Sequence, residues 1–558
     1  MTQTAGQVAH SARASVGIST WLNVNVWHWR LATLAIAATV AAPIVVVCAA
    51  WLTPSGEIWR HLADTILLEL IRNTVVLIVG VGAGVLVLGV GLAWLTAMYD
   101  FPGRRLFDWA LMLPLAIPAY VLAFVFVGLL DVSGPVQTWL RHNVGAQPNW
   151  FPPVRSHGGV VTVLVLAFYP YVYLLARAAF LSQGHAMLET GRVFGLRPWS
   201  AFLRVAIPVA RPAIAAGVAL ALMETLADFG AVSVFNYDTF TTAIYKAWFG
   251  LFNLDAAAQL ASLLLLFVAL ALYGERRMRG NARYDVRGGP GRTKRYRLHG
   301  GRAAGATALA ASVLLFAFVI PVAQLTLWAW SAMAQELDLR YLRFFANTVF
   351  LGSVAALITT FGALLLAYTY RLRPDRLTRA GVRFATLGYA LPGSVLAVGI
   401  MLSFVWLDQR IAGVLAHWGL QAGLLLTGSL IAVILAYMVR FMAVAHGPVD
   451  SGFERIGPSL LQAARSLGCG TWEILWRVFI PILRTGALSA ILLVFVEVMK
   501  EMPATLLLRP FGWDTLATRI FELTSEGEWE RAALPAINLV LLGLIPVVML
   551  VRRSGAQP

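Results

Sequence analysis

The sequence is poor in charge and in cysteine. Only 13% of its 558 residues are charged, and 43 basic residues outnumber 27 acidic ones, which gives a net charge of +16. Its two cysteines are Cys48, inside an apolar run, and Cys469, inside a polar segment. Two cysteines in such different surroundings do not predict a structural disulfide.

Motifs typical of enzymes are also missing. The pattern G-x-x-x-x-G-K-[ST] does not occur, and the glycine-rich run from Gly80 to Gly91 lies in an apolar stretch without a following lysine. There, Gly80 and Gly84 predict close helix packing instead. His157 and the other histidines lack metal-site spacing, and no Ser-His-Asp or Cys cluster suggests catalysis. We therefore expect no catalytic residue, no metal site and no cofactor on this chain.

Hydrophobic residues, by contrast, make up 59% of the chain and occur in long runs. Runs of about 20 residues are long enough to cross a membrane, and continuous runs favour helices over barrel strands. The runs cover about 31–52, 73–98, 106–130, 158–181, 210–234, 254–274, 303–331, 347–370, 384–405, 422–446, 482–508 and 533–552. The sequence thus predicts an all-α integral membrane protein with 12 transmembrane helices, in contact with membrane lipid.

Basic residues concentrate on one side of this arrangement. If the N-terminus is cytoplasmic, the inward segments hold 29 basic residues and the outward segments hold 11. Cytoplasmic loops are enriched in Lys and Arg, so both termini are predicted to be cytoplasmic. The positive charge then reflects membrane orientation, and no nucleic acid partner is expected. The first run, Leu31 to Leu52, is long enough to span, so a cleaved signal peptide is not expected.

The chain repeats itself at an offset of 273 or 274 residues. The matched positions are Asn73-Thr74 with Asn347-Thr348, Pro118 with Pro392, and ETLADFGA from Glu224 with EVMKEMPA from Glu497. Six spans per half give both halves the same orientation, related by a pseudo-two-fold axis along the membrane normal. We predict a first half over 1–274, a flexible basic cytoplasmic linker over 275–302, and a second half over 303–558.

Two matched polar segments interrupt the hydrophobic pattern on the cytoplasmic side. Residues 189–208 read ETGRVFGLRPWSAFLRVAIP, and residues 462–481 read QAARSLGCGTWEILWRVFIP. Each predicts a short helix, a turn at Gly195 or Gly468, and an amphipathic piece that ends where Pro208 or Pro481 opens the next span. A single copy would suit a surface connector. Two copies favour paired sockets for a partner.

The second segment resembles the EAA loop of permease subunits of binding-protein-dependent ABC importers. The family pattern is E-A-A, three residues, G, nine residues and I-x-L-P. The matching residues are Gln462, Ala463, Ala464, Gly468 and Pro481. The first copy departs from the pattern, since Glu189 keeps the acid but Thr190 and Gly191 replace the alanines. The resemblance implies coupling loops at about 182–209 and 447–481, the first of them more polar.

The resemblance covers nearly the whole chain and implies a type I ABC importer permease fold of two six-helix repeats in the bacterial inner membrane. It implies two ATP-binding cassette subunits on the cytoplasmic side, which use ATP, and a periplasmic binding protein that docks on the outward loops 131–157 and 509–532. The fused halves and the run from Glu497 to Ala536 look most like ferric-iron permeases. Acids in the second outward loop provide docking charge or are merely solvated. They are Glu522, Glu526, Glu528 and Glu530.

Acidic residues also fall inside two predicted spans. Glu224 and Asp228 lie on one face of the fifth span, and Glu497 and Glu501 repeat this in the eleventh. An acid at the centre of a span costs at least ~2.5 kcal/mol, so it faces a polar cavity or a partner. The four acids line a path for a hydrated cation, or they bond to neighbouring helices and to Lys500.

Two matched residues follow these acids, and two arginines lie within other spans. Gly230 and Pro503 come just after them, and each either loosens the helix or ends the span. Arg177 and Arg440 lie near the inward ends of their spans and are expected to snorkel to the lipid headgroups.

Other functions stay open at this stage. Fused or similar permeases for thiamine, phosphonates and polyamines share much of the pattern. A secondary transporter also uses parallel six-helix repeats, but it would need no ATPase partner. A membrane enzyme ranks last because no catalytic cluster is visible.

Overall fold

The computed structural model describes residues 27–52, 56–145, 151–193, 198–279, 295–372, 374–419, 423–469 and 471–555. In these ranges, 12 helices are long and apolar enough to cross a membrane. The prediction of a twelve-span, all-α membrane protein is confirmed. The chain divides into two compact units, Met1–Ala50 with Phe345–Asp514 (unit 1) and Trp51–Phe344 with Thr515–Pro558 (unit 2).

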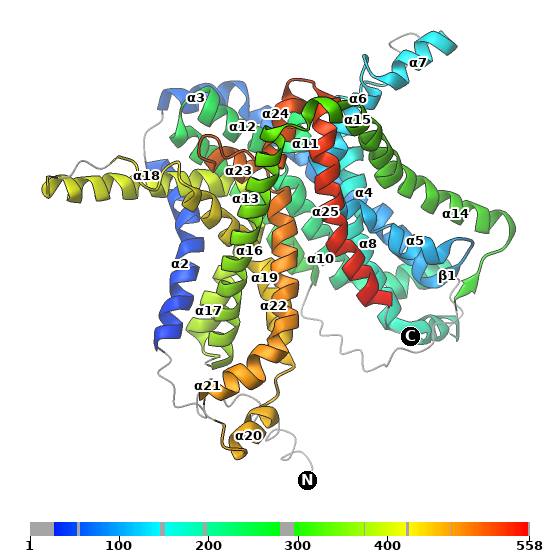
Figure 1. The fold of residues 1–558 in the computed structure, drawn as a ribbon. Coiled ribbons are helices and arrows are strands. Elements are labelled where there is room, and N and C mark those ends of the chain that lie inside the picture. Colours follow the sequence, from blue (N-terminus) through cyan, green and yellow to red (C-terminus); the bar gives the residue numbers. More distant parts are fainter. Residues whose placement is uncertain are drawn as a thin grey trace. The chain divides into compact units, whose positions relative to one another are not determined.

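Unit 1 combines the first span with spans eight to eleven (Figure 1). Its helices are α2 (Trp27–Ala49), α16 (Leu339–Leu372), α17 (Arg376–Ala385), η9 (Leu387–Ala390), α18 (Gly393–His417), α19 (Leu430–Glu454), α20 (Pro458–Ser466), α21 (Thr471–Ile474), η10 (Leu475–Phe479), α22 (Ile480–Lys500) and α23 (Pro503–Leu508).

Unit 2 combines spans two to seven with the last span. Its first elements are η3 (Ala50–Leu52), α3 (Gly56–Thr65), α4 (Leu67–Met98), β1 (Tyr99–Asp100), α5 (Arg104–Ala110), η4 (Leu113–Ala116), α6 (Ala119–Leu130), α7 (Pro135–Val144), α8 (His157–Val193), α9 (Pro198–Ala201), η6 (Phe202–Ala206) and α10 (Ile207–Ala227). The remaining elements are α11 (Gly230–Val234), α12 (Phe240–Tyr245), η7 (Lys246–Gly250), α13 (Leu254–Arg279), β2 (Tyr296–Arg297), α14 (Gly300–Leu314), η8 (Leu315–Val319), α15 (Ile320–Glu336), α24 (Leu516–Ser525) and α25 (Trp529–Gly555).

The first span belongs to the unit formed by the second half. In unit 1, α2 packs along α17 and α18, and Figure 1 shows α2 beside α17. Arg30 of α2 forms an ion pair with Asp375, and the Trp29 ring meets Tyr368 edge-on at 5.1 Å. Gly399 allows the closest approach, since a Cβ atom there would lie 2.6 Å from the Pro43 carbonyl oxygen.

The seventh span makes the corresponding exchange in unit 2. There α14 and α15 contact α5 and α6 of the first half, and α25 packs against α15. A Cβ atom at Gly128 of α6 would lie 2.8 Å from the Trp328 ring. Each first span thus packs with the other half's third-span region. The compact units are a different division of the chain from the sequence repeat, whose boundaries stay a prediction.

The glycine-rich face of α4 packs directly on α8. A Cβ atom at Gly84 would lie 2.3 Å from a methyl group of Val165, and one at Gly80 would lie 3.0 Å from Val161. Small residues at this spacing let two helix backbones approach closely. The prediction of a packing face, and not a nucleotide loop, is confirmed.

Both third spans are broken at matched prolines. Pro118 is the N-cap of α6 and Pro392 the N-cap of α18, each with extended backbone and with a short 3₁₀ turn before it. Proline has no amide hydrogen and disfavours a helical residue before it, so the chain restarts its helix at this point. The two halves therefore share this helix break as well as the matched residues.

The segment predicted as a flexible linker is structured at both ends. The helix α13 runs on to Arg279, and β2 pairs in parallel with β1, with Tyr99 opposite Tyr296 and Asp100 opposite Arg297. Residues 280–294 lie outside the described ranges. This two-residue pairing departs from the all-helical prediction, and it joins the inward-predicted end of α4 to the start of the second half.

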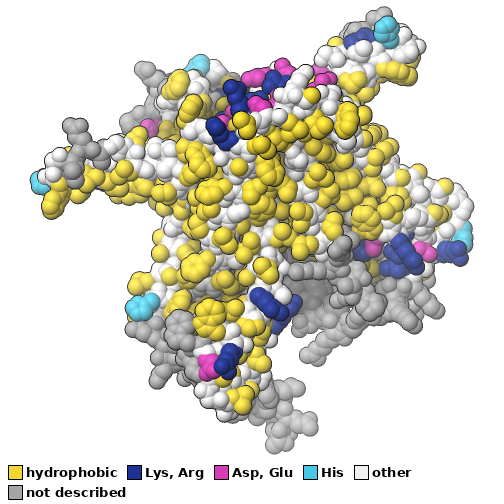
Figure 2. All heavy atoms as spheres, in the orientation of Figure 1, with side chains coloured by type: hydrophobic (Ala, Val, Ile, Leu, Met, Phe, Trp, Pro, Cys, Tyr) yellow, Lys and Arg dark blue, Asp and Glu magenta, His cyan; other side chains and the backbone are white. Residues whose placement is uncertain are grey.

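Large apolar side chains are exposed along the spans, and Figure 2 shows them as broad yellow surfaces. Examples are Leu488 on α22, Trp330 on α15 and Phe361 on α16, all more than 60% exposed. Such surfaces are unstable in water and stable against lipid tails. They fit the prediction that these helices contact membrane lipid.

Candidate functional site

The second coupling loop contains a separate short helix that ends at the predicted glycine. The helix α20 ends at Ser466, and Gly468 takes a left-handed backbone with φ of +82°. The Cys469 amide donates to the Ala464 carbonyl at 3.1 Å, which closes a Schellman motif. A side chain at Gly468 would be strained, so the glycine is required by the turn.

Two of the three predicted contact residues on α20 lie on its surface. Gln462 and Ala463 are exposed, whereas Ala464 is buried. Leu467 and Trp476 are 83% and 63% exposed. Exposed large apolar side chains beside a polar helix are suited to contact with another protein.

The first coupling loop is built differently. The fourth span, α8, continues without a break to Val193 and includes Glu189, so the separate short helix predicted for this copy is not present. In the second copy, Gly457 and Pro458 separate α19 from α20, and the first copy has no proline at the corresponding point. The predicted turn residue Gly195 lies outside the described residues.

Both loops end in the same way. A π-helical turn, η6 or η10, comes directly before Ile207-Pro208 and Ile480-Pro481, which open α10 and α22. Proline cannot donate an amide hydrogen and crowds the carbonyl four residues earlier. The wider π turn accommodates this defect, and Pro208 and Pro481 start the next spans as predicted.

In the first half, Glu224 lies in the last turn of its span and Asp228 directly after it. The helix α10 ends at Ala227, three residues after Glu224, and Asp228 is its C-cap. The Val232 amide of α11 donates to Asp228 Oδ1 at 3.1 Å, and Thr241 Oγ1 donates to the Asp228 carbonyl at 2.7 Å. The fifth span therefore ends before residue 234, where the apolar run predicted its end, because the helix breaks between Asp228 and α11.

In the second half, the matched acids are both paired with basic residues. Glu497 lies 3.1 Å from Lys500 Nζ. Glu501 is the C-cap of α22 and only 6% exposed, and its Oε2 lies 3.2 Å from Arg440 Nε. Its Oε1 accepts a hydrogen bond from the Ala504 amide of α23 at 3.1 Å. One carboxylate therefore caps α23 and neutralises a buried arginine.

The buried ion pair between Glu501 and Arg440 requires a glycine at Gly393, the first residue of α18. A Cβ atom at Gly393 would lie 2.5 Å from Glu501 Oε1 and 3.0 Å from Arg440 Nη1. Arg440 itself is 8% exposed. The expectation that Arg440 snorkels to lipid headgroups is therefore wrong.

Arg177, the other arginine expected to snorkel, is also paired. It binds both carboxylate oxygens of Asp108 at 2.7 and 2.6 Å. This bidentate geometry is the strong form of an arginine–carboxylate bond. No local pattern predicts this pair, since its members are 69 residues apart.

The breaks after the acids start new helices. Gly230 is the first residue of α11 and Pro503 the first residue of α23. Neither residue ends the span by itself, since α10 and α22 have already stopped at Ala227 and Lys500. Proline suits the first position of a helix, where its missing amide is not needed.

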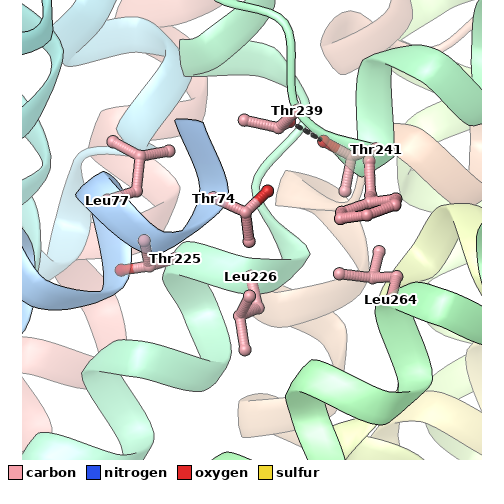
Figure 3. Close-up of a pocket in the computed structure, with 8 residues that line it drawn as sticks. Thr74, Leu77, Thr225, Leu226, Thr239, Thr241 and Leu264 are labelled. Atoms are coloured by element: carbon pink, nitrogen blue, oxygen red, sulfur yellow. Dashed lines mark hydrogen bonds between the residues drawn. The ribbon is translucent and has the colours of Figure 1, made fainter. Parts of the chain in front are cut away.

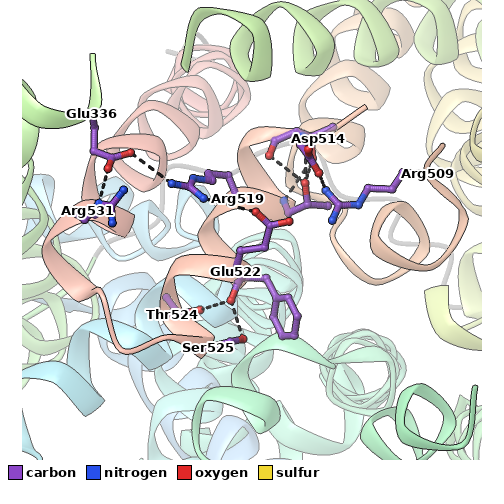
Figure 4. Close-up of polar contacts among 11 residues, drawn as sticks. Glu336, Arg509, Asp514, Arg519, Glu522, Thr524, Ser525 and Arg531 are labelled. Carbon is purple, nitrogen blue, oxygen red and sulfur yellow. Dashed lines mark hydrogen bonds and ion pairs between the residues drawn. The ribbon is translucent and has the colours of Figure 1, made fainter. Parts of the chain in front are cut away.

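An ionic cluster ties the end of the seventh span to α24 and α25 within unit 2 (Figure 4). Glu336 at the end of α15 is paired with Arg531 and lies 3.8 Å from Arg519 Nη2. Arg519 Nη1 also lies 3.6 Å from Glu522. Glu522 is thus part of a local network, whereas Glu526, Glu528 and Glu530 are exposed.

A polar basin opens beside this cluster in unit 2. Its volume is about 450 Å³. The lining residues are Arg155, Ser233, Val234, Asn236, Phe521, Thr524, Ser525, Glu526, Gly527 and Trp529. Both loops predicted to receive the binding protein contribute to it. Arg155 is held at its wall by Asp131 at 3.2 Å and by the Val234 carbonyl at 2.9 Å.

No group of three His, Cys, Asp or Glu side chains within the described ranges could hold a metal ion. His157, the histidine considered earlier, bonds through Nδ1 to the Tyr237 hydroxyl at 2.8 Å. Its Nε2 lies 3.3 Å from Arg72 Nη2. This histidine therefore serves a local hydrogen-bond network.

Comparison with known proteins connects these features. The family model described as "binding-protein-dependent transport system inner membrane component" matches residues 86–279 and 349–550, so it covers both repeats. The chain belongs to this family. Each match contains one coupling loop and one acid-bearing break. The chain is a multi-pass permease component of an ABC transport system, and its predicted resemblance is confirmed.

Similar proteins are named as transport permeases. The Fe(3+)-transport system permease protein FbpB 2 of Haemophilus influenzae is 29% identical over 86% of this chain and 89% of its own length. The putative ferric transport system permease protein FbpB 1 of the same organism is 26% identical over 84% of this chain and 73% of its own length. The sulfate transport system permease protein CysW of Escherichia coli is 33% identical over 31% of this chain and 58% of its own length. Membership in the family implies partner subunits such as a binding protein and an ATPase.

Proposed function

We propose that this permease carries ferric iron across the bacterial inner membrane as part of an ATP-driven importer. The supporting observation is the extent of similarity. The match to the Fe(3+) permease of Haemophilus influenzae covers 86% of this chain and 89% of that protein, whereas the match to the shorter sulfate permease covers 31% of this chain and 58% of that protein. A match over both repeats includes the segments that would form the pathway, so it supports transport of the same solute.

The test is uptake into proteoliposomes that contain the permease, its ATPase and its binding protein. We expect ATP-dependent accumulation of radioactive Fe³⁺, and none when the ATPase lacks its P-loop lysine. Sulfate, 2-aminoethylphosphonate, thiamine and a polyamine serve as competing solutes. ATP-dependent uptake of one of these, without iron uptake, would overturn the substrate assignment but leave the importer intact.

On the cytoplasmic side, two ATPase subunits bind the two coupling loops, with both termini of the chain on the same side. The features that support this are the exposed Leu467 and Trp476 and the fixed turn at Gly468. ATP is bound and hydrolysed by those subunits, and this chain binds no cofactor. A gradient-driven secondary transporter would instead move solute without any ATPase.

The acids at the span ends form part of the iron path. Glu224 and Glu497 are both only partly buried. An acid that is partly accessible and close to a helix break can contact a hydrated cation. Replacing both by Gln should sharply reduce uptake while ATPase activity stays normal. Undiminished uptake in that variant would leave the acids a purely structural role.

On the opposite side, the binding protein docks over the polar basin of unit 2. Arg155 and Glu526 place opposite charges at its wall, beside the exposed Glu528 and Glu530. Complementary charges at an interface raise the association rate more than the affinity. Reversing Glu526, Glu528 and Glu530 to Lys should slow binding-protein association, with a smaller effect at high salt.

A further inference from the structure

The asparagines at the heads of the second and eighth spans make the same long-range contact. Asn73 Nδ2 donates to the main-chain oxygen of Asp238 at 2.8 Å, and Asn347 Nδ2 donates to that of Asp514 at 3.0 Å. The bonded residues are 165 and 167 positions apart. One contact lies within unit 2 and the other within unit 1, so the structure forms this bond twice, independently.

Each accepting carbonyl stands directly before a capping box. Thr239 and Thr242 form the box that opens α12, and Thr515 and Thr518 form the one that opens α24. In both, the N-cap amide donates to the second threonine hydroxyl at 2.9 Å. The sequence pattern D-T-x-x-T occurs in both loops, so the whole arrangement is part of the repeat.

Both bonds are partly buried, and Asn347 is more accessible than Asn73. Asn73 is 5% exposed, and the N-cap threonines Thr239 and Thr515 are 6% and 4% exposed. A buried carbonyl that loses its donor keeps its desolvation cost without compensation. The amide is therefore the feature that holds the loop in place, and a side chain of equal size without a donor cannot replace it.

The first of these loops also holds the break in the acid-bearing span. Thr241, next to the capping box, donates to the Asp228 carbonyl at 2.7 Å, and its hydroxyl lies 2.9 Å from that of Thr239. Figure 3 shows Thr239 and Thr241 facing Thr74 across a small cavity of about 10 Å³. The N-terminal part of α4, the capping box and the break at Asp228 thus form one hydrogen-bonded corner.

The two corners are supported differently. In unit 2, the Tyr237 hydroxyl donates to the Asn73 carbonyl at 3.3 Å. In unit 1, the residue before Asp514 is Trp513, whose ring packs against Phe350 at 5.8 Å. The asparagine bond is the part that the two corners share.

We propose that Asn73 and Asn347 are positioning residues for transport. Each fastens the head of its span, α4 or α16, to the loop that follows the broken acid-bearing span, so that the two move as one piece when the pathway opens. This inference rests on the transport function proposed above. It assigns a role to Asn73-Thr74 and Asn347-Thr348, which the sequence marked only as repeated.

The first test measures hydrogen exchange on the purified full-length chain and needs no transport activity. The variants are Asn73→Leu, Asn73→Asp, Asn347→Leu and Asn347→Asp. We expect amides of residues 239–245 to exchange about tenfold faster in the Asn73 variants, and those of 515–525 in the Asn347 variants, each without change in the other loop. Aspartate is nearly isosteric and keeps the fold if leucine does not.

The matched control is Asn253→Asp, in which the side-chain oxygen continues to accept the Ala256 amide bond of 2.7 Å. Its exchange in both loops should equal that of the unmodified chain. Unchanged exchange in the Asn73 and Asn347 variants would overturn the inference, as would an equal increase in both loops.

The second test measures the ATP hydrolysed per solute transported in proteoliposomes. Positioning predicts that this ratio, measured below the melting temperature of each variant, rises several-fold in the Asn73→Asp and Asn347→Asp variants and stays unchanged in Asn253→Asp. An unchanged ratio despite faster exchange would reduce the asparagines to structural residues. If the unmodified system transports a solute other than iron, the iron assignment fails. The role of the asparagines is then still decided by hydrogen exchange and by the ATP hydrolysed per molecule of that solute.

Discussion

The ends of α10 and α22 are copies of one sequence element placed in different surroundings. Both helices stop at an acid, both acids accept an amide from the next short helix, and both next helices start at the matched residue Gly230 or Pro503. At Glu501, however, a buried arginine completes the site, whereas Asp228 has no basic partner within the described residues. At the repeat offset, Arg440 corresponds to Ala167.

This difference separates what the duplication keeps from what it varies. The carboxylate cap is kept because a helix that restarts needs an acceptor for its first amides. The charge balance differs, since the second copy has an arginine and the glycine that makes room for it. At the position of Gly393 the first half has Ala119. One half therefore holds its break by an ion pair and the other by backbone hydrogen bonds.

The largest expected effect comes from removing the arginine. Arg440→Ala leaves Glu501 buried without its cation, which costs about 3–5 kcal/mol of stability. We expect little folded protein, measured by thermal unfolding in detergent. The double variant Arg440→Ala with Glu501→Gln should recover part of the loss, because it leaves no buried charge. A double variant no better than the single one would refute the ion-pair account.

A smaller effect is expected from filling the space beside the pair. Gly393→Ala places a Cβ atom against Glu501 and Arg440, and overpacking of this kind costs about 1–3 kcal/mol. The matched change in the first half, Ala119→Gly, creates no such clash and should cost no more than about 1 kcal/mol. Melting temperatures of the two variants give the comparison directly. Equal losses would mean that the halves do not differ at this point.

Replacing Gly468 at the turn of the second coupling loop by alanine is expected to destabilise the loop by about 1 kcal/mol. Gly468→Ala must adopt the left-handed backbone at φ of +82°, which Ala tolerates poorly, whereas Gly468→Asn tolerates it better. We expect Ala to weaken ATPase binding or coupling and Asn to retain most of it, measured by ATP-dependent uptake. The same substitutions at Gly195 show whether the first loop contributes equally. Identical activity of the Ala and Asn variants at Gly468 would argue against a role for the turn.

The smallest effect is expected at the cap of the first break. Asp228→Asn keeps an oxygen that accepts the Val232 amide and removes no ion pair, so it should cost less than about 1 kcal/mol. Glu501→Gln also keeps an acceptor but leaves Arg440 buried without its anion, and it should cost several times more. Chemical denaturation of both variants measures the ratio. A larger loss for Asp228→Asn would reverse the comparison.

Much of this architecture could be predicted because it depends on local sequence. Twelve runs of about 20 apolar residues must form spanning helices in lipid, and the turn at Gly468 follows from the freedom of glycine. The break in the acid-bearing spans was placed only approximately. Glu224 and Asp228 fit one helical face in the sequence, but helix length alone does not reveal that the backbone stops at Ala227.

The exchanged first spans could not be predicted from the repeat. The same apolar run satisfies its hydrophobic surface against either half, so pattern alone does not choose between them. The choice is made by particular contacts, such as Arg30 with Asp375 and the close approach of Gly399 to Pro43. In the same way, the position of Arg440 near the end of a span predicts snorkelling, whereas its ion pair with Glu501 keeps it buried.

The sequence by itself determined that the chain is a duplicated membrane protein with a matched polar segment in each half, because span length, loop charge and turn residues are local and periodic properties. Its resemblance to a permease family rested on the residues of the second segment. The tertiary structure alone decided which charges are neutralised and which loops are tied together. Those depend on side chains tens to hundreds of residues apart, such as Arg440 with Glu501 and Asn73 with Asp238. Their pairing is favourable only where folding has removed water from both partners.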